Sequence, residues 1–210
     1  MKAKRKPWGH EYLIYENESV AIWHLFLEKG QSTSLHCHPN KKTGLVVLCG
    51  GARISFLNGQ QKAFAVEKVM IRHGVFHQTT NMTGETLQLF EIETPVDKAD
   101  IVRLEDSYGR AGVPYGNEDD VDVPDLSLFD SLDWQRIGDC EVCVRNMSSL
   151  EGLGAPELIM ITQGGISFNQ YQVAGPGDTI DLQTFRSLAE KFSIDSNTQG
   201  VLIKSCMTPQ

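Results

Sequence analysis

The sequence predicts an all-β fold, a small antiparallel barrel or sandwich, from two features of its first half. Short apolar runs alternate with turn-forming segments that contain glycine and asparagine, of which Gly50-Gly51 and Asn58-Gly59 are the clearest. In the same part of the chain, no apolar run keeps a period of 3.6 residues over the length of a helix. Many short strands separated by such turns are typical of β-sandwiches and β-barrels.

The expected strands follow one another closely along the first half of the chain. In residues 19–28 both alternating faces are apolar, as expected where one face lines a barrel and the other packs on a neighbour or a second subunit. Asn58-Gly59 predicts a tight hairpin between two of the strands. We expect strands at residues 12–15, 19–28, 34–38, 45–48, 53–57, 62–66, 69–71, 77–79 and 86–93.

The chain divides into an N-terminal domain (residues 1–110), an acidic connector (111–133) and a C-terminal part (134–210). The connector is interrupted by glycine and proline and carries a strongly acidic run, and we expect it to wrap one barrel. The C-terminal part weakly repeats the first: its stretch 158–168 parallels 45–56. We therefore predict a second, degenerate barrel without a metal site. The alternative is a helix-bearing C-terminal extension, with a short helix in residues 184–192.

Composition and charge favour a soluble protein that handles a small anionic molecule. Of the 210 residues, 40% are hydrophobic and 22% charged, which is ordinary for a globular protein. Residues 1–110 hold 14 basic and 12 acidic side chains, and residues 111–210 hold 5 and 15. The mildly basic first half suits an anionic substrate, and the acidic second half argues against nucleic acid or an anionic membrane as a partner.

Two further observations favour the cytoplasm. No apolar run approaches the ~18 residues that cross a bilayer, and the basic N-terminus runs into Pro7 without the apolar region of a secretory signal. The five cysteines are scattered and odd in number, which fits a reducing compartment. Cys140-x-x-Cys143 lies in an expected strand, where positions three apart face opposite ways, so we interpret it as a pair of packed thiols.

Any metal site that the histidines form lies in the first half of the chain, because all six of them precede residue 78. In an extended strand His36 and His38 point to the same face, while Cys37 points to the other. Each imidazole offers one ring nitrogen to a divalent ion, and His77 is a candidate third ligand. The alternative is that these are ordinary strand histidines.

These segments resemble the two motifs of the cupin superfamily. In the first motif the spacing is Gly30, five residues, His36-x-His38, four residues, Thr43, six residues and a final glycine. The second runs from Val66 through Arg72-x-Gly74 to His77 and then to Asn81, with five, two and three residues between them. The spacing holds throughout, but Thr43 replaces a glutamate, Val66 a glycine and Arg72 a proline.

Two end segments resemble a particular cupin subfamily. Residues 6–9 (Lys-Pro-Trp-Gly) and 100–110 (Asp-Ile-Val-Arg-Leu-Glu-Asp-Ser-Tyr-Gly-Arg) resemble the ends of the cupin domain of type II mannose-6-phosphate isomerases, which are often fused to mannose-1-phosphate guanylyltransferases. The resemblance covers residues 6–110. It implies a double-stranded β-helix, or jelly-roll barrel. Together with the weak repeat in the C-terminal part, it predicts a bicupin whose second barrel is degenerate.

The resemblance implies a divalent cofactor (Zn, Ni, Mn or Fe) held by His36, His38 and His77. Because Thr43 is a poor ligand, the ion would keep its full charge and open positions for an anionic or chelating substrate. Glu91 or Glu93 could restore a carboxylate if the strand over residues 86–93 turns its odd face inward, although Gln88, Phe90 and Ile92 compete for the interior.

The function that these features predict is aldose–ketose isomerisation of a sugar phosphate, as in mannose-6-phosphate isomerases. Glu91 or Glu93 is the candidate base. By resemblance Arg110 would reach the substrate, and Thr43 would stand beside it. Lys41, Lys42 and Arg72 flank the ligand segments and are candidate phosphate contacts, with solvated loop charges as the alternative.

Two other functions remain open at the level of sequence. Thr43 also fits a non-catalytic cupin that binds a small sugar-type ligand in a regulatory role. More weakly, three histidines fit a three-His iron dioxygenase, because the thiol dioxygenases share that ligand set. Cupins commonly pair through a barrel face, so the apolar outer face of residues 19–28 predicts a homodimer.

Overall fold

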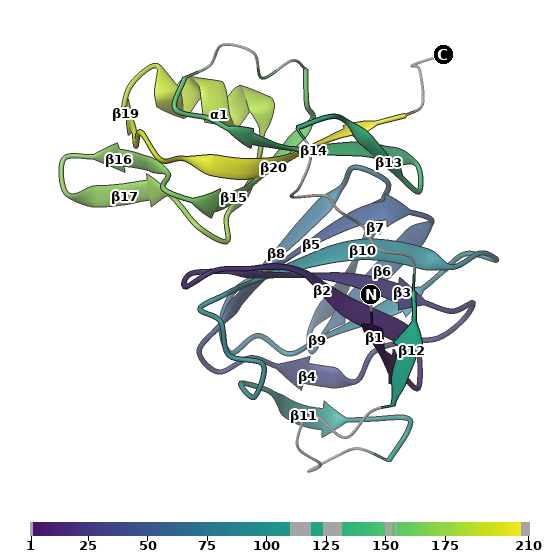
Figure 1. Cartoon of the computed structure of the whole chain (residues 1–210). Helices are drawn as coiled ribbons and strands as arrows, with labels where there is room; N and C mark the ends of the chain where they lie inside the picture. The colour runs from purple at the N-terminus through teal and green to yellow at the C-terminus, as the bar shows by residue number, and fades with distance from the viewer. Residues whose placement is uncertain (1, 110–118, 124–131, 150–152, 154, 207–210) are drawn as a thin grey trace. The chain divides into compact units, whose positions relative to one another are not determined.

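The computed structural model describes residues 2–109, 119–123, 132–149, 153 and 155–206 (Figure 1). Its internal contacts separate the chain into two compact units, Met1–Leu126 and Ser127–Gln210, which are described in turn.

The first unit consists of two antiparallel sheets. In the order of their neighbours, the strands of the larger sheet are β12 (Asp120–Asp122), β1 (Lys2–Lys6), β2 (Gly9–Glu16), β3 (Ala21–Leu27), β10 (Leu87–Thr94), β5 (Lys42–Cys49) and β8 (Lys68–Ile71). Those of the smaller sheet are β11 (Val102–Glu105), β4 (Leu35–Cys37), β9 (His77–Asn81), β6 (Gly51–Phe56) and β7 (Gly59–Phe64). Neighbouring strands are often far apart in sequence, as in a jelly roll.

Both sheets contribute side chains to one apolar core. Alternate residues of the strands enter it, which is the period-2 pattern of strands that bury one face. The buried residues of this core are Trp8, Leu25, Leu27, Leu45, Val47, Ala52, Ile54, Ala63, Val69, Ile71, Leu87 and Leu89. The all-β prediction for the first half is therefore confirmed, and each of the nine expected strands overlaps a strand of the structure.

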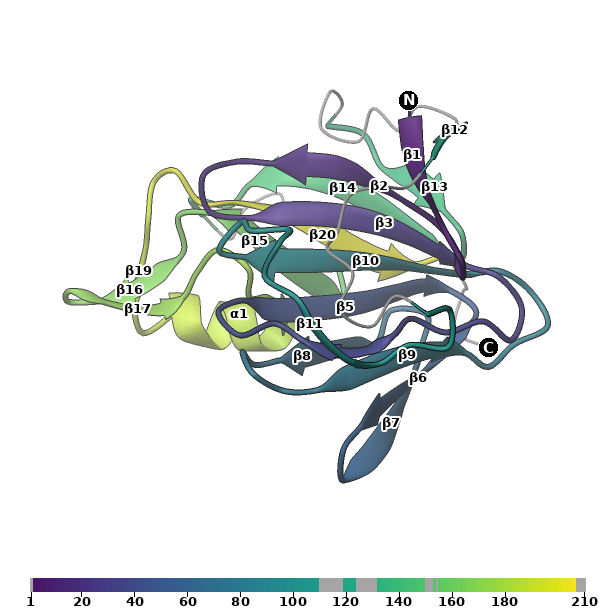
Figure 2. The ribbon, with the colours of Figure 1, turned by 90° about the horizontal axis from the view of Figure 1, so that it is seen from below.

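The predicted hairpin joins β6 to β7, and it projects from the rest of the barrel (Figure 2). Because Phe56 pairs with Gly59, the two turn residues are Leu57 and Asn58, one position earlier than the Asn58-Gly59 signal placed them. Strands β1, β11 and β12 lie outside the expected set. Strand β12 pairs with β1, so this described part of the acidic connector belongs to the first unit.

The second unit has two smaller sheets and one helix. The strands of the larger sheet are β13 (Gln135–Ile137), β14 (Cys140–Asn146), β20 (Gln199–Ser205), β15 (Leu158–Gln163) and β18 (Thr179–Asp181). The smaller sheet has β17 (Tyr171–Ala174), β16 (Ile166–Phe168) and β19 (Ser193–Ile194), and helix α1 spans Leu182–Ala189. Cys140 and Cys143 are buried cysteines of β14.

Helix α1 forms where the alternative interpretation of the C-terminal part expected one. Asp181 caps its first turn, because its carboxylate accepts a hydrogen bond from the backbone N–H of Thr184 at 2.8 Å. Phe185 is completely buried in the core of this unit. At the offset that His77 has in the first half, the repeat in the C-terminal part has Leu188, which lies on this helix rather than on a strand.

The strand pairing of the second unit repeats that of the first. Strand β15 pairs with β18 and β20, as β5 pairs with β8 and β10. Strand β16 likewise pairs with β17 and β19, as β6 pairs with β7 and β9. This pattern agrees with a degenerate second barrel, and the bicupin interpretation stays a prediction.

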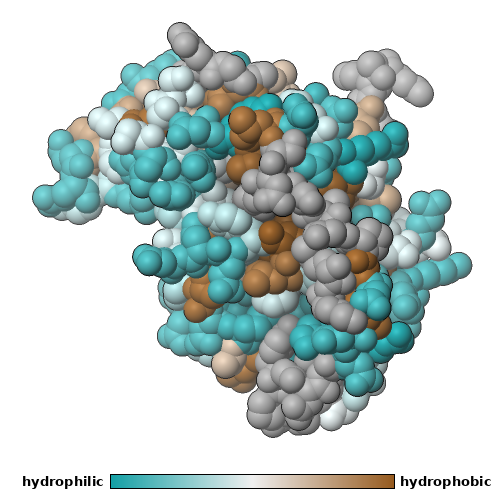
Figure 3. Space-filling view, viewed as in Figure 1, coloured by the Kyte–Doolittle hydropathy of each residue, from teal (hydrophilic) through white to brown (hydrophobic). Residues whose placement is uncertain are grey.

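Hydrophilic residues cover most of the face that Figure 3 shows, with hydrophobic residues in small groups among them. Among the described residues, no helix has the length and apolar character needed to span a membrane.

Candidate metal centre

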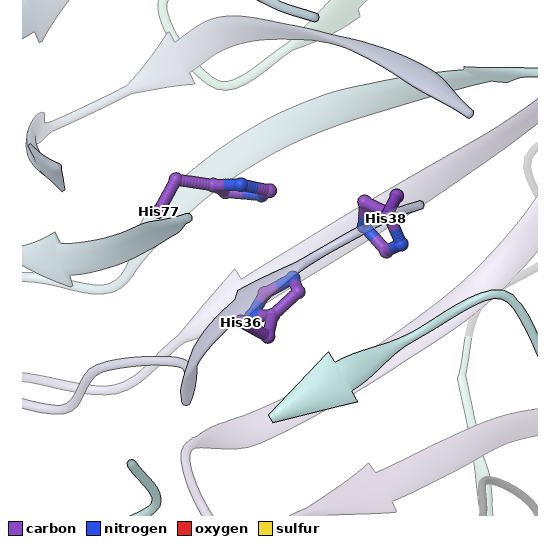
Figure 4. A group of neighbouring side chains, drawn as sticks. All are labelled: His36, His38 and His77. Atoms are coloured by element: carbon purple, nitrogen blue, oxygen red, sulfur yellow. The ribbon is translucent and has the colours of Figure 1, made fainter. Parts of the chain in front are cut away.

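The barrel brings His36, His38 and His77 together. His36 lies on β4, His38 directly follows that strand, and His77 opens β9 directly opposite His36. The ring centroids are 5.0 Å apart for His36 and His38, 4.5 Å for His36 and His77, and 5.6 Å for His38 and His77. The three rings point toward one another inside the barrel (Figure 4).

Backbone carbonyls determine which ring nitrogen of each histidine carries the proton. Nδ1 of His36 donates to the carbonyl oxygen of Ser34 at 2.8 Å, and Nδ1 of His38 donates to that of Asp100 at 2.6 Å. Nδ1 of His77 donates to the carbonyl oxygen of Val75 at 3.0 Å. Because a carbonyl only accepts, each Nδ1 must be protonated and each Nε2 keeps its lone pair.

The free nitrogens fit a divalent ion. One ligand atom from each ring lies within 4.8 Å of those of the other two. The Nε2 atom of His77 is buried and has no hydrogen-bond partner among the described residues, which is costly unless something binds it. Three neutral imidazoles are a common donor set for a first-row divalent ion, so the residues present fit the metal that the cupin resemblance implies.

Burial keeps these rings neutral. It is the main reason that the pKa of His36 lies well below its ordinary value, and the neighbouring His77 and His38 lower it further. Burial also lowers the pKa of His38, with help from the Lys41 ammonium, and lowers the pKa of His77 to about 4. At neutral pH the rings are therefore available as ligands without losing a proton.

Asp100 is not one of the three histidines, but it orients His38 through hydrogen bonds. Its backbone carbonyl accepts the His38 proton, and its carboxylate accepts hydrogen bonds from the backbone N–H groups of Asn40 and Lys41, both at 2.9 Å. These hydrogen bonds outweigh the effect of burial and hold the pKa of Asp100 below its ordinary value. The loop after His38 is thus tied to the segment before β11.

A cavity opens beside the histidines, with an empty volume of about 610 Å³ that includes its mouth. One part of its wall is apolar and comes from Trp8, Leu25, Leu45 and Ile101. The charged part comes from Lys6, Glu11, Lys41, Glu91, Glu93, Lys98 and Arg103. A concave site with an apolar wall and a few converging polar groups is typical of small-molecule binding.

Both candidate carboxylates enter this cavity, because β10 turns its odd face inward. One carboxylate oxygen of Glu91 and one of Glu93 lie within 4.8 Å of each other and of a His38 nitrogen. They form a group that shares only His38 with the histidine trio. Burial, and then the charge of Glu93, raise the pKa of Glu91 to about 7. Gln88, Phe90 and Ile92 take the opposite face.

Glu93 belongs to a buried array of alternating charges. Lys41 donates to it at 2.7 Å, and Lys98 lies 3.8 Å away. Lys98 is also 3.6 Å from Glu11, which is 3.5 Å from Lys6. Burial works to lower the pKa of Lys98, but the nearby carboxylates together raise it above its ordinary value. The array keeps five charges inside the protein because each meets an opposite charge.

The structure separates the predicted substrate contacts. Thr43 is buried, shares a face with Leu45 and pairs with Glu93 across the sheet, and its hydroxyl has no partner among the described residues. Lys42 and the exposed Arg72 do not line the cavity. Arg110 lies outside the described residues.

For Lys41 the solvated-loop alternative is wrong. Its side chain is only 1% exposed and lines the cavity, because Glu93 supplies a buried counter-charge.

Sequence reasoning missed Lys6, Glu11, Lys98 and Arg103 as site residues. Lys6 and Arg103 belong to the two end segments that carried the subfamily resemblance, which was a usable signal. Glu11 and Lys98 show no signal in the sequence, because a charged residue in an apolar strand or a loop normally faces solvent.

Part of the chain is similar to known proteins. The family described as mannose-6-phosphate isomerase C-terminal matches residues 2–106. The mannose-1-phosphate guanylyltransferase ManC of Salmonella typhimurium is 30% identical over 108 residues, which are 50% of this chain and 22% of that protein. The xanthan biosynthesis protein XanB of Xanthomonas campestris is 28% identical over 109 residues, 50% of this chain and 23% of that one. The chain thus spans less than a quarter of these relatives.

Solved structures are also similar to part of the chain. A Klebsiella pneumoniae protein with a double-stranded β-helix domain is 20% identical, with a TM-score of 0.41, over 45% of this chain and 82% of its own. A putative sugar phosphate isomerase from Acidithiobacillus ferrooxidans is 25% identical, with a TM-score of 0.35, over 38% of this chain and 52% of its own.

The family match covers half of the chain and, within the two-sheet unit, the strands from β1 to β11. It includes all three histidines and both carboxylates of the cavity. The chain belongs to the family of the mannose-6-phosphate isomerase C-terminal domain, and its first unit is a cupin.

Proposed function

We propose that this cupin is metal-dependent and interconverts an aldose phosphate and a ketose phosphate, with mannose 6-phosphate as the first substrate to test. The observation that carries the proposal is the placement of a buried carboxylate pair beside three histidines whose free nitrogens converge. His36, His38 and His77 would hold the ion, which would polarise the carbonyl and hydroxyl oxygens of a bound sugar.

Glu91 is the residue that we assign to proton transfer. Aldose–ketose isomerisation removes a proton from the carbon next to the carbonyl, and the carbonyl oxygen gains a proton, which gives an enediol. The carbon-bound proton then returns to the former carbonyl carbon, while the other hydroxyl oxygen loses its proton. A group that does both must be able to take and release a proton near neutral pH. The pKa of Glu91, raised to about 7, suits both tasks, whereas Glu93 is engaged with Lys41 at 2.7 Å.

The surrounding residues support this role of Glu91. Trp8, Leu25 and Leu45 line the cavity and limit the access of water to the reacting carbons. The Lys41–Glu93 ion pair is buried on both sides, and the charge of Glu93 helps to raise the pKa of Glu91.

Turnover of mannose 6-phosphate by the purified, metal-loaded chain tests the proposal. Glu91→Gln removes the base and keeps the shape, so kcat should fall about 100- to 10,000-fold. Glu85→Gln, at an exposed position, is the matched control and should leave kcat unchanged. Folded, metal-loaded wild-type protein without turnover of sugar phosphates would exclude isomerisation.

A non-catalytic role is the second candidate. Thr43 supports it, because the buried hydroxyl replaces the carboxylate of the cupin motif. Such a protein would bind a small sugar-type ligand in the same cavity without converting it. Iron in the purified protein together with oxygen uptake on a thiol would instead favour a three-His dioxygenase.

A further inference from the structure

The carboxylate of the first cupin motif is missing from its expected place on β5. That place is Thr43, whose buried side chain shares a face with Leu45, a residue of the cavity wall. The Thr43 hydroxyl has no hydrogen-bond partner among the described residues. A neutral hydroxyl is a poor ligand for a first-row divalent ion, so three imidazoles alone would hold the ion unless a carboxylate reaches it from another strand.

The neighbouring strand carries a carboxylate at the directly paired position. Glu93 on β10 is the cross-strand partner of Thr43, and paired residues of an antiparallel sheet share a face, with Cβ atoms about 5 Å apart. Glu93 therefore enters the cavity beside the place from which the motif's glutamate would extend. Glu91 pairs instead with Leu45, farther along β5, and stays available for proton transfer.

One oxygen of Glu93 is held and the other is open. Lys41 donates to Oε1 at 2.7 Å, and Lys98 lies 3.8 Å from the same atom. Oε2 makes no hydrogen bond to any residue that the structure describes, although the Glu93 side chain is buried. A buried oxygen without a partner is costly unless something binds it. A hydrogen bond to one carboxylate oxygen is also what orients the other toward a metal ion.

The Glu93 carboxylate lies close to one of the three histidines. One of its oxygens is within 4.8 Å of a His38 nitrogen. Ligand atoms that share a first-row ion lie roughly 3 to 4 Å apart, because each bond to the ion is about 2.0–2.2 Å long. The group that contains Glu93 shares only His38 with the histidine trio, so a bond to the ion requires the Glu93 side chain to rotate toward His36 and His77.

We propose that Glu93 is the fourth ligand of the metal centre, and that it supplies from β10 the carboxylate that the motif places on β5. Lys41 holds Oε1 and leaves Oε2 for the ion. The inference rests on the metal centre of the proposed function, and it does not depend on the isomerisation.

Titration with Co²⁺ tests this assignment, because the visible absorption bands of Co²⁺ depend on the atoms bound to it. The full chain is first freed of metal with a chelator. Glu93→Gln should change the bands and lower the Co²⁺ affinity about 10- to 100-fold below that of Glu11→Gln. Glu11→Gln is the matched control, because it also removes a buried carboxylate of the cavity wall but belongs to neither group of candidate ligands. Its bands should be those of wild type.

Exchange of the two paired residues is a second test. In the double variant Thr43→Glu/Glu93→Thr the carboxylate extends from β5, as in the motif, so the wild-type bands and most of the affinity should be retained. A folded exchange variant that binds Co²⁺ no more tightly than Glu93→Gln overturns the inference. Thermal melts establish folding. If Glu93→Gln does not fold because Lys41 loses its counter-charge, Glu93→Asp takes its place, since it keeps the charge and shortens the side chain.

The outcomes separate this inference from the proposed function. Wild-type bands in folded Glu93→Gln, with the same Co²⁺ affinity as Glu11→Gln, overturn the role of Glu93. Wild-type protein that binds no Co²⁺ overturns the metal centre and the inference together. Bands that depend on Glu93 in a protein without turnover of mannose 6-phosphate support the inference and contradict the isomerase.

Discussion

At the scale of single residues, three carbonyl oxygens prepare the metal centre. Each accepts the Nδ1 proton of one histidine, so the opposite nitrogen of each ring is left as a donor toward the centre. Sequence spacing could predict that His36 and His38 share a strand face, because the alternation of a strand is a local property. It could not predict the tautomers, because the carbonyl of Asp100 reaches His38 from 62 residues away.

The carboxylate of Asp100 positions His38, so its loss should weaken metal binding. Asp100→Ala frees the loop at Asn40 and Lys41, which the carboxylate holds through two backbone hydrogen bonds. We expect metal affinity to fall about 10- to 100-fold in a competition titration with a chelator. Asp97→Ala, at an exposed position of the same segment, is the control. Equal affinity of the two variants would show that Asp100 has no such role.

His24 should make the stability of the protein depend on pH. It is fully buried, and burial lowers its pKa from 6.5 to about 3. The unfolded chain therefore takes up a proton near pH 6.5 and the folded chain does not until about pH 3. The contribution of His24 to the free energy of unfolding is fully present above the unfolded pKa. As the pH falls below that value, the contribution decreases by about 1.4 kcal/mol per pH unit.

The substitution His24→Gln removes this contribution. The free energy of unfolding, measured by urea denaturation between about pH 6 and pH 4, should fall less steeply in the variant, by roughly 1 kcal/mol per pH unit. The other buried histidines keep the remaining slope in both proteins. If the free energy of unfolding fell equally steeply with pH in both proteins, the role of His24 in the pH dependence would be contradicted.

At the scale of the strands, the chemistry of the cavity depends on which of the two alternating faces of β10 points inward. Leu87, Leu89, Glu91 and Glu93 share one face of β10. The two leucines pack in the core, and the two glutamates line the cavity. Periodicity alone could not choose between this face and that of Phe90 and Ile92, because both contain apolar residues and both are buried. The charges on the inner face are tolerated because Lys41 and Lys98 come from other segments, which a local pattern does not contain.

Val66 is a strained position between β7 and β8. It stands where the cupin motif has glycine, and its φ of 64° lies in the left-handed region that side chains with a branched Cβ rarely adopt. Val66→Gly should raise the free energy of unfolding by about 1 kcal/mol. Val66→Ala is the control and should gain less, because the Cβ atom remains. A Gly variant that unfolds at lower denaturant concentration than the Ala variant would exclude strain.

At the scale of the whole chain, the sequence predicts the first unit better than the second. The first has turns with strong signals, two spaced motifs and a strand for each expected segment. In the second, residues 184–192 alternate too weakly to indicate a strand, and Asp181 with Thr184 caps a helix there. The repeated pairing of β15 and β16 depends on contacts between distant segments, so it became visible only in the fold.

The account depends most on the convergence of three imidazoles on one divalent ion. Elemental analysis of the purified chain after exposure to Zn, Ni, Mn and Fe tests it directly, with His77→Ala and the exposed His73→Ala side by side. We expect about one ion per chain in wild type and in His73→Ala, and a loss of most of it in folded His77→Ala. Equal metal content in the two variants, or a well-folded wild-type protein that binds no metal, would contradict the metal centre.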